Sequence, residues 1–245
     1  VAARAVAGPN EGLILAVHGN VSGVETGGAP CQILPIPHQC EDLRPYAAPD
    51  SFGVEWFIVV AVSRPTYDTQ ISHVTFGIGD YDPDLLEIVY AQPCMTPPRP
   101  LEIPTLNWPG PNSGTTLSWS PACLDGGIQP VYNFGVYAYG PGSIPLDAHP
   151  IFPTGVVDCM VDTQKDLFDG MGVMGCRGNI GQNPNCPSEE EMGACCFFSS
   201  CKQMTKDKCR AQGGDWVEGP CDEQSCLTAV PTKTSTWGSI KSLYR

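Results

Sequence analysis

Four acidic side chains near residue 84 have the types and spacing of a calcium site. They are Asp80, Asp82, Asp84 and Glu87, and the first three alternate along the chain. Calcium takes hard oxygen ligands, and alternating carboxylates in a turn can bring several of them together. The stretch does not follow the EF-hand pattern, because position 6 would be a leucine and position 12 an alanine. Two interpretations stay open: a calcium (Ca²⁺) site, or a solvated acidic turn between two strands.

Thirteen cysteines offer a second kind of chemistry, and the chain has no Cys-x-x-Cys pair. Seven precede residue 187 and six follow it: Cys31, Cys40, Cys94, Cys123, Cys159, Cys176, Cys186, Cys195, Cys196, Cys201, Cys209, Cys221 and Cys226. This pattern is typical of disulfides formed in an oxidising compartment, and it argues against a zinc site.

The cysteine spacings also suggest pairings in the first group. Local pairing would give Cys31–Cys40 and Cys94–Cys123, and the other three cysteines would then supply one pair and one unpaired thiol. Because seven is odd, the remaining cysteine is a buried free thiol, or it bridges to the later group or to another chain.

No arrangement of residues indicates a catalytic mechanism, and we expect a protein that is not an enzyme. The four histidines lack metal-binding spacing, and the chain has no G-x-S-x-G, G-x-G-x-x-G or P-loop motif. Structural or surface roles are therefore expected for His18, His38, His73 and His149. A carboxylate pair for glycoside cleavage would come from separate strands. Glu55, Glu87 and Asp158 lie in or beside expected strands, but nothing selects among them.

Two stretches have the composition of glycosylation sites. Asn20-Val21-Ser22 is an N-glycosylation sequon, which either carries a glycan or occurs by chance. Residues 228–236 are rich in threonine and serine, a composition found in O-glycosylated linkers.

The body that positions these residues is predicted to be mainly β. Apolar or alternating runs predict strands at 12–18, 54–62, 71–78, 85–91, 114–120, 131–139 and 154–161. The run 54–62 is apolar almost throughout and predicts a strand buried on both faces. Proline-rich residues 93–111 predict an ordered crossing loop or an edge, and 163–171 a single helical turn. Residues 1–186 are therefore predicted to form a β-sandwich or jelly-roll-like body.

Residues 187–226 are predicted to form a small six-cysteine disulfide module. They hold too few apolar residues for a core, so disulfides must stabilise them, at about 2–4 kcal/mol each. Cys195 and Cys196 are adjacent, so their side chains point apart and should pair with different partners. Residues 205–212 predict a short helical segment that stops at Gly213-Gly214.

Residues 227–245 are predicted to be a basic linker and docking tail, extended or in a short helix. The tail has a formal charge of +3, whereas residues 1–186 carry −12 and residues 187–226 carry −4. Trp237, Ile240 and Tyr244 would share one side of a short helix. The expected docking residues are Trp237, Ile240, Lys241, Leu243, Tyr244 and Arg245.

The C-terminal motifs resemble those of a group of secreted bacterial proteins from environmental genomes. The similar stretches are the Gly193-Ala194-Cys195-Cys196 module and the W-G-x-I-K-x-L-Y-R ending, together with VTFGI at 74–78 and FGVYAYG at 134–140. The resemblance implies export and a shared C-terminal arrangement, in which the tail is similar to a surface-sorting signal. It implies no particular activity.

Composition and charge exclude several classes of partner. A formal charge of −13 repels nucleic acid and anionic membranes. No apolar run approaches the roughly 20 residues of a membrane span, so we expect no membrane insertion. The start, Val1-Ala2-Ala3-Arg4, is typical of a protein after signal-peptide removal. We expect an extracellular or cell-surface location.

Three hypotheses of function remain. The first is a non-enzymatic structural protein whose tail assembles a homo-polymer: a filament, tube or surface layer. The alternative is a secreted carbohydrate-binding or glycan-active β-sandwich protein that stacks sugars on Trp108, Trp119, Tyr137 and Tyr139. A calcium-dependent adhesin is the third, and it rests on the acidic turn.

Overall fold

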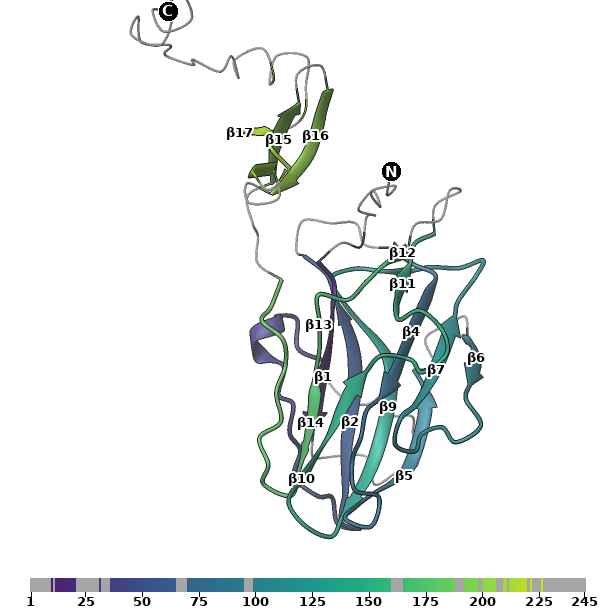
Figure 1. Ribbon diagram of the computed structural model, residues 1–245. Helices are drawn as coiled ribbons and strands as arrows, with labels where there is room; N and C mark the ends of the chain where they lie inside the picture. The colour runs from purple at the N-terminus through teal and green to yellow at the C-terminus, as the bar shows by residue number, and fades with distance from the viewer. Residues whose placement is uncertain are drawn as a thin grey trace, which may run out of the picture. The chain divides into compact units, whose positions relative to one another are not determined.

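The chain folds into mainly β structure that divides into two compact units, Val1–Ser188 and Glu189–Arg245. The computed structural model, drawn in Figure 1, describes residues 10, 12–20, 31, 36–64, 70–94, 99–159, 165–187, 192–197, 200–205, 209–210, 212–219, 221 and 226. Each unit is described by itself below. No helix in this described part is both long enough and apolar enough to cross a membrane.

The first sheet of unit 1 has five strands in the order β13-β1-β2-β9-β5. Their bounds are β1 (Ile14–Asn20), β2 (Val54–Val62), β5 (Leu86–Pro93), β9 (Ile128–Ala138) and β13 (Gly170–Met171). Neighbours are antiparallel except β1 and β13, which are parallel. Among the described strands β5 is an edge, with a bulge between Ile88 and Tyr90.

The second sheet of unit 1 is built around β4, as Figure 1 shows. Its strands are β4 (His73–Ile78), β6 (Leu101–Pro104), β7 (Ser113–Ser118), β10 (Gly142–Asp147), β11 (Gly155–Val157), β12 (Lys165–Asp166) and β14 (Val173–Cys176). β7 pairs with the whole of β4, while β11 and β10 pair with the two ends of its other side. β6 lies beside β7 as an edge strand within the predicted loop-or-edge region. The short strands β3 (Gln70–Ile71) and β8 (Leu124–Asp125) pair separately.

The core of unit 1 follows from the alternation of its strands. Phe57, Val59 and Phe134 from the first sheet pack in one cluster with Val74 and Phe76 from the second. The outer side of β2 is buried as well, because Ile58, Val60 and Val62 pack in a second cluster with Leu43 of the segment after the 3-10 turn η2 (Cys40–Asp42). The predicted strand buried on both faces is therefore confirmed.

The predicted helical turn at 163–171 is wrong. Lys165–Asp166 form β12 and Gly170–Met171 form β13, on two different sheets. Two-residue strands are too short to show an alternating apolar pattern, so no periodicity in the sequence predicts them.

The predicted disulfide pairs of the body are also wrong. The structure pairs Cys31–Cys94, Cys40–Cys186 and Cys123–Cys159, across separations of 63, 146 and 36 residues. Cys31 and Cys40 both pack against the outer cluster of the first sheet, and Cys94, the partner of Cys31, belongs to that cluster. Cys176 is the remaining cysteine: it is free and buried, as one of the alternatives predicted.

Unit 2 is a three-stranded antiparallel sheet in the order β16-β15-β17. The strands are β15 (Met192–Phe197), β16 (Ser200–Thr205) and β17 (Asp215–Glu218). The indole of Trp216 lies directly over Gly193, where a Cβ would collide with the ring. Its Nε1 donates to the Met204 carbonyl at 3.1 Å, so a single tryptophan joins the three strands.

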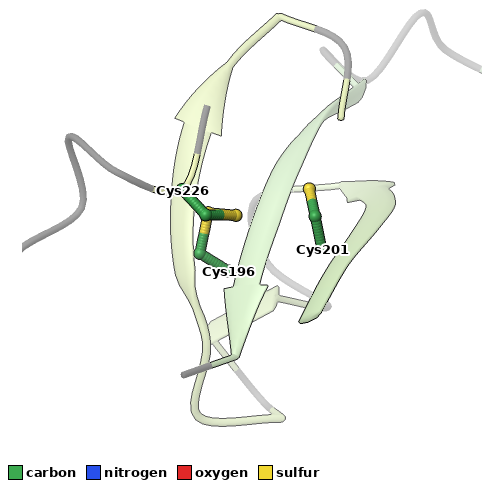
Figure 2. A group of neighbouring side chains, drawn as sticks. All are labelled: Cys196, Cys201 and Cys226. Atoms are coloured by element: carbon green, nitrogen blue, oxygen red, sulfur yellow. A yellow bond between two sulfur atoms is a disulfide. The ribbon is translucent and has the colours of Figure 1, made fainter. Parts of the chain in front are cut away.

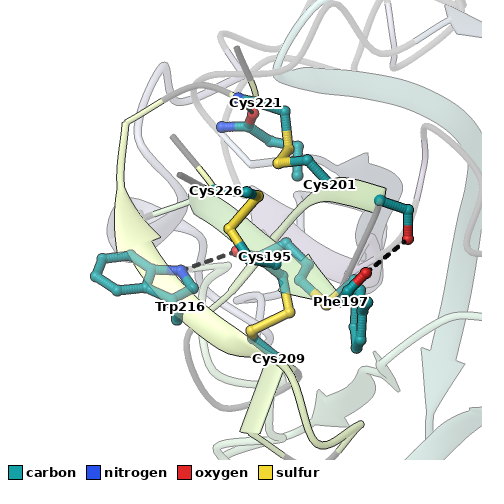
Figure 3. Close-up of a disulfide and its surroundings, with 11 residues drawn as sticks. Cys195, Phe197, Cys201, Cys209, Trp216, Cys221 and Cys226 are labelled. Carbon is teal, nitrogen blue, oxygen red and sulfur yellow. Dashed lines mark hydrogen bonds between the residues drawn. A yellow bond between two sulfur atoms is a disulfide. The ribbon is translucent and has the colours of Figure 1, made fainter. Parts of the chain in front are cut away.

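Three disulfides hold this sheet together, as Figure 3 shows: Cys195–Cys209, Cys196–Cys226 and Cys201–Cys221. The adjacent Cys195 and Cys196 have different partners, as predicted. The predicted helical segment at 205–212 falls partly outside the described residues, and Thr205 ends β16. The C-terminal cysteine cluster is thus a disulfide-rich module.

Candidate functional site

Two aromatic side chains meet on the outer surface of the first sheet. Trp56 of β2 and Tyr90 of β5 both lie opposite Gly135 of β9, one on each side. Their rings pack edge to face, with centroids 5.2 Å apart. A Cβ at residue 135 would lie 3.0 Å from the Trp56 ring and 3.1 Å from the Tyr90 Cβ. Glycine in the central strand therefore lets the two rings touch across it.

Two tyrosines continue this aromatic surface along β9. Tyr137 and Tyr139 are 36% and 56% exposed, and their ring centroids are 5.1 Å apart at a tilt of 55°. The Tyr139 hydroxyl donates to Glu87 Oε2 at 3.1 Å. That hydrogen bond and the charge of Glu87 raise the pKa of Tyr139, so its hydroxyl stays protonated. We call Trp56, Tyr90, Tyr137, Tyr139 and Glu87 the aromatic face.

Asp50 holds Trp56 in place. Its carboxylate accepts the Trp56 indole N–H at 2.9 Å and the backbone N–H groups of Phe52 and Val54 at 2.8 and 2.9 Å. Burial acts to raise the pKa of Asp50, but the hydrogen bonds from Trp56 and the neighbouring backbone outweigh it and lower that pKa. Asp50 is therefore ionised and adds negative charge beside the aromatic rings.

The acidic turn before β5 lies at the same end of the sheet. The Tyr139 N–H donates to the Leu85 carbonyl at 2.9 Å, which places the turn that carries Asp82 and Asp84 next to the aromatic face. One cation is also present: Arg177 donates to the carbonyls of Ala138 and Tyr139. The chemistry of the surface is therefore aromatic and mainly anionic, which suits ligands with cationic and apolar side chains.

The two tryptophans expected to stack on sugars are not on this surface. Trp119 is buried in the core. Trp108 packs edge to face against Phe76 and Tyr132, and its indole donates to the Tyr132 hydroxyl at 2.7 Å. Their expected role in sugar stacking is therefore wrong. Both follow turn-rich or alternating stretches whose sequence does not reveal which side faces the core.

The structure does not gather the four predicted calcium ligands. In the described part of the chain, one group of three possible metal ligands lies within 4.8 Å of one another: Cys196, Cys201 and Cys226. This group includes no carboxylate. Asp82 instead accepts the Asp84 N–H at 3.0 Å, and Asp80 accepts a bond from Asn112 at 3.5 Å. A calcium site at this turn therefore stays a prediction, beside the acidic-turn alternative.

Figure 2 draws the cysteine group of unit 2, Cys196, Cys201 and Cys226, whose sulfur atoms lie near one another. Cys196 is bonded to Cys226, and Cys201 to Cys221. Zinc binds thiolates, and a sulfur in a disulfide is not one. The cluster therefore acts as covalent support for the sheet.

The three candidate catalytic carboxylates lie in different surroundings. Glu55 is buried and accepts the Arg177 N–H with both carboxylate oxygens, at 2.9 and 3.1 Å. Burial raises the pKa of Glu55. Burial, together with the nearby Glu55 carboxyl, also raises the pKa of the Cys176 thiol. Glu87 belongs to the aromatic face, and Asp158 is buried beside a cavity of about 270 Å³. The structure does not bring the three together.

The histidines take structural positions. His18 accepts the Arg44 N–H at 3.1 Å, and His149 Nδ1 accepts the N–H of Phe152 at 2.9 Å. His73 lies between the hydroxyls of Ser72 and Ser118, at 2.7 and 2.9 Å. Burial lowers the pKa of these three rings, so each is neutral at pH 7. His38 is exposed.

Two groups of predicted residues fall outside this description. Asn20 is the last residue of β1, but the other two residues of the sequon are outside the described residues, so glycosylation stays a prediction. The docking tail, 227–245, also lies wholly outside the described residues.

The sequence did not identify Trp56 and Tyr90 as site residues. Trp56 stands in a strand predicted to be buried, and the bulge before Tyr90 shifts the alternation of β5. Gly135 could have pointed to this surface. A glycine in the middle of an aromatic strand often marks a place where another group packs closely against the backbone.

Comparisons with known proteins give little further guidance. No protein-family model matches the chain, and no curated protein matches it. A chain of the crystal structure of the CaDoc0917–CaCohA2 complex at pH 5.5 is similar, with 16% identity and a TM-score of 0.38. The match covers 65% of this chain and 96% of that one. A TM-score of this size carries no argument about function.

Proposed function

We propose that the protein is a non-enzymatic extracellular protein that works through protein–protein contacts, and that its C-terminal tail docks on a second copy to build a filament, tube or surface layer. The extracellular part rests on the six disulfides, which are typical of oxidising compartments. A disulfide-stabilised β framework is a rigid support for such contacts.

The observation that carries the assembly proposal is the division of charge along the chain. Residues 227–245 carry +3 with no acidic residue, and residues 1–186 carry −12. Opposite charges on two parts of the same chain favour association between copies and speed their encounter. The tail also has apolar side chains to bury, each worth about 1.5–3 kcal/mol before the cost of ordering the segment.

Removal of residues 228–245 tests this proposal. The full chain should form polymers visible by electron microscopy and a high mean mass by light scattering, and the shortened chain should remain monomeric. A control chain of full length, with Lys233, Lys241 and Arg245 changed to glutamine, should assemble poorly at low salt. Polymers that are unchanged after removal of the tail would refute its role.

Carbohydrate binding is the second candidate, and the exposed Tyr137–Tyr139 pair beside Glu87 is the observation that favours it. Its rings are tilted by 55°, however, and Trp56 and Tyr90 cross at 69°, so the four do not form one flat stacking platform. A panel of oligosaccharides titrated calorimetrically into the full chain tests it: binding that Tyr139→Ala abolishes would support this candidate, and no heat would reject it.

A further inference from the structure

We propose that the aromatic face is the surface that receives the C-terminal tail of a second copy of the chain. This inference rests on the proposed function and names the docking surface within it. The aromatic face joins three features: the exposed rings of Tyr137 and Tyr139, carboxylates that accept hydrogen bonds from its rings, and the strand β5, whose outer edge no described strand covers.

The chemistry of the tail matches that of the aromatic face. Positive side chains are attracted to the faces of Trp and Tyr rings, and they pair with carboxylates. The tail supplies both cations and apolar side chains: Lys233, Trp237, Ile240, Lys241, Leu243, Tyr244 and Arg245. Edge-to-face packing of the kind already seen between Trp56 and Tyr90 accommodates further aromatic side chains without a flat platform.

Charge favours the same pairing. Two carboxylates, from Asp50 and Glu87, accept hydrogen bonds from rings of the aromatic face, and the turn that carries Asp82 and Asp84 is joined to Tyr139 by a backbone hydrogen bond. One guanidinium, from Arg177, donates to the Tyr139 carbonyl. A tail of charge +3 therefore meets a surface of opposite sign.

The edge of the sheet adds main-chain binding capacity. β5 pairs with β9 on one side, and no described strand pairs with its other side. An edge strand presents N–H and C=O groups that an extended peptide can use as an added strand. Tyr90 and Glu87 stand on this edge strand, so a peptide along it would also contact the aromatic face.

A second apolar surface, on the outer side of the other sheet, fits the tail less well. Leu101, Ile103 and Phe152 are exposed in unit 1, but the carboxylate of Glu102 is engaged by Thr115 and Tyr132. The nearby charged group is the ammonium of Lys165, which donates to the Pro153 carbonyl. The described groups named here offer no free carboxylate to a basic tail, and this surface supplies the control residue Phe152.

The test compares two matched pairs of substitutions in the full chain. Tyr139→Ala and Phe152→Ala each remove one half-exposed ring, and Glu87→Lys and Glu41→Lys make the same change of net charge at different exposed sites. The concentration needed for assembly is measured by light scattering for each variant, beside the chain that lacks 228–245. Circular dichroism and calorimetric melting confirm that each variant is folded.

We expect Tyr139→Ala and Glu87→Lys each to raise the required concentration about ten-fold, because aromatic anchors and their charged partners dominate interfaces. Phe152→Ala and Glu41→Lys should raise the concentration required for assembly less than about three-fold.

If both members of a pair behave alike while removal of the tail abolishes assembly, the aromatic face is not the docking surface and the proposed function stands. If removal of the tail changes nothing, the proposed function itself fails. If Tyr139→Ala abolishes oligosaccharide binding and leaves assembly intact, the face is a glycan site and this inference is overturned.

Discussion

Asp50→Ala should destabilise unit 1 by a predictable amount. The substitution removes three hydrogen bonds, from the N–H groups of Phe52 and Val54 and from the Trp56 indole. A buried bond contributes about 1 kcal/mol, so three would give about 3 kcal/mol. Asp50 is only half-buried and water can replace the lost acceptor, so we expect a loss of about 1–2 kcal/mol. That corresponds to a melting temperature lower by roughly 3–6 °C in a unit of this size.

Differential scanning calorimetry of the full chain measures this effect. Because the folded protein holds the pKa of Asp50 below its ordinary value of 3.8, the carboxylate contributes stability above that pH and loses it as the pH falls through the lowered pKa. The stability difference between the wild-type chain and Asp50→Ala should thus be full at pH 7 and shrink as the pH falls from 3.8 through the lowered pKa. Asp125→Ala, at an exposed strand end, is the control. An unchanged melting temperature of Asp50→Ala at pH 7 would refute the role given to Asp50. An equal loss of stability at pH 7 and at a pH below the lowered pKa would refute it as well.

Three further predictions concern groups away from the aromatic face. The Cys176 thiol should not react with Ellman's reagent in the native protein, and one thiol should appear in denaturant without reductant; rapid native reaction would contradict its burial. Because the folded state raises the pKa of Glu55, wild-type stability should fall relative to Glu55→Gln as the pH rises from about 4.5 to 7, as calorimetry can show; the opposite trend would contradict this sign. Replacing Cys195 and Cys209 by serine should destabilise unit 2 by about 3 kcal/mol and leave the melting of unit 1 unchanged. A shift in both transitions would show that the units do not unfold separately.

Local apolar pattern was enough to predict most of the body. The strand at 54–62 was predicted to its end residues, since a buried β-branched run between turn residues has few alternatives. The strand at 71–78 was predicted as one piece, whereas the structure breaks it at Ser72 into β3 and β4. The adjacent cysteines of the module were also understood correctly, because geometry alone forces them apart.

Long-range pairing could not be predicted. Cys40 joins Cys186 because the segment after η2 covers the outer face of β1 and β2, and nothing near Cys40 in the sequence encodes that. The aromatic face also depends on long-range pairing. Trp56, Tyr90 and Gly135 come from three strands, and the register between those strands brings them together. Sequence pattern fixes which side of a strand is apolar, but the neighbours across the sheet depend on the whole topology.

Photo-crosslinking from the aromatic face tests the central claim most directly. The full chain would carry p-benzoylphenylalanine in place of Tyr139, be mixed with an equal amount of ¹⁵N-labelled wild-type chain, and be irradiated and analysed by mass spectrometry. We predict crosslinks that join the peptide containing residue 139 of one isotope to peptides from residues 227–245 of the other. Crosslinks between copies at other segments, or none between copies at all, would contradict docking of the tail on this face.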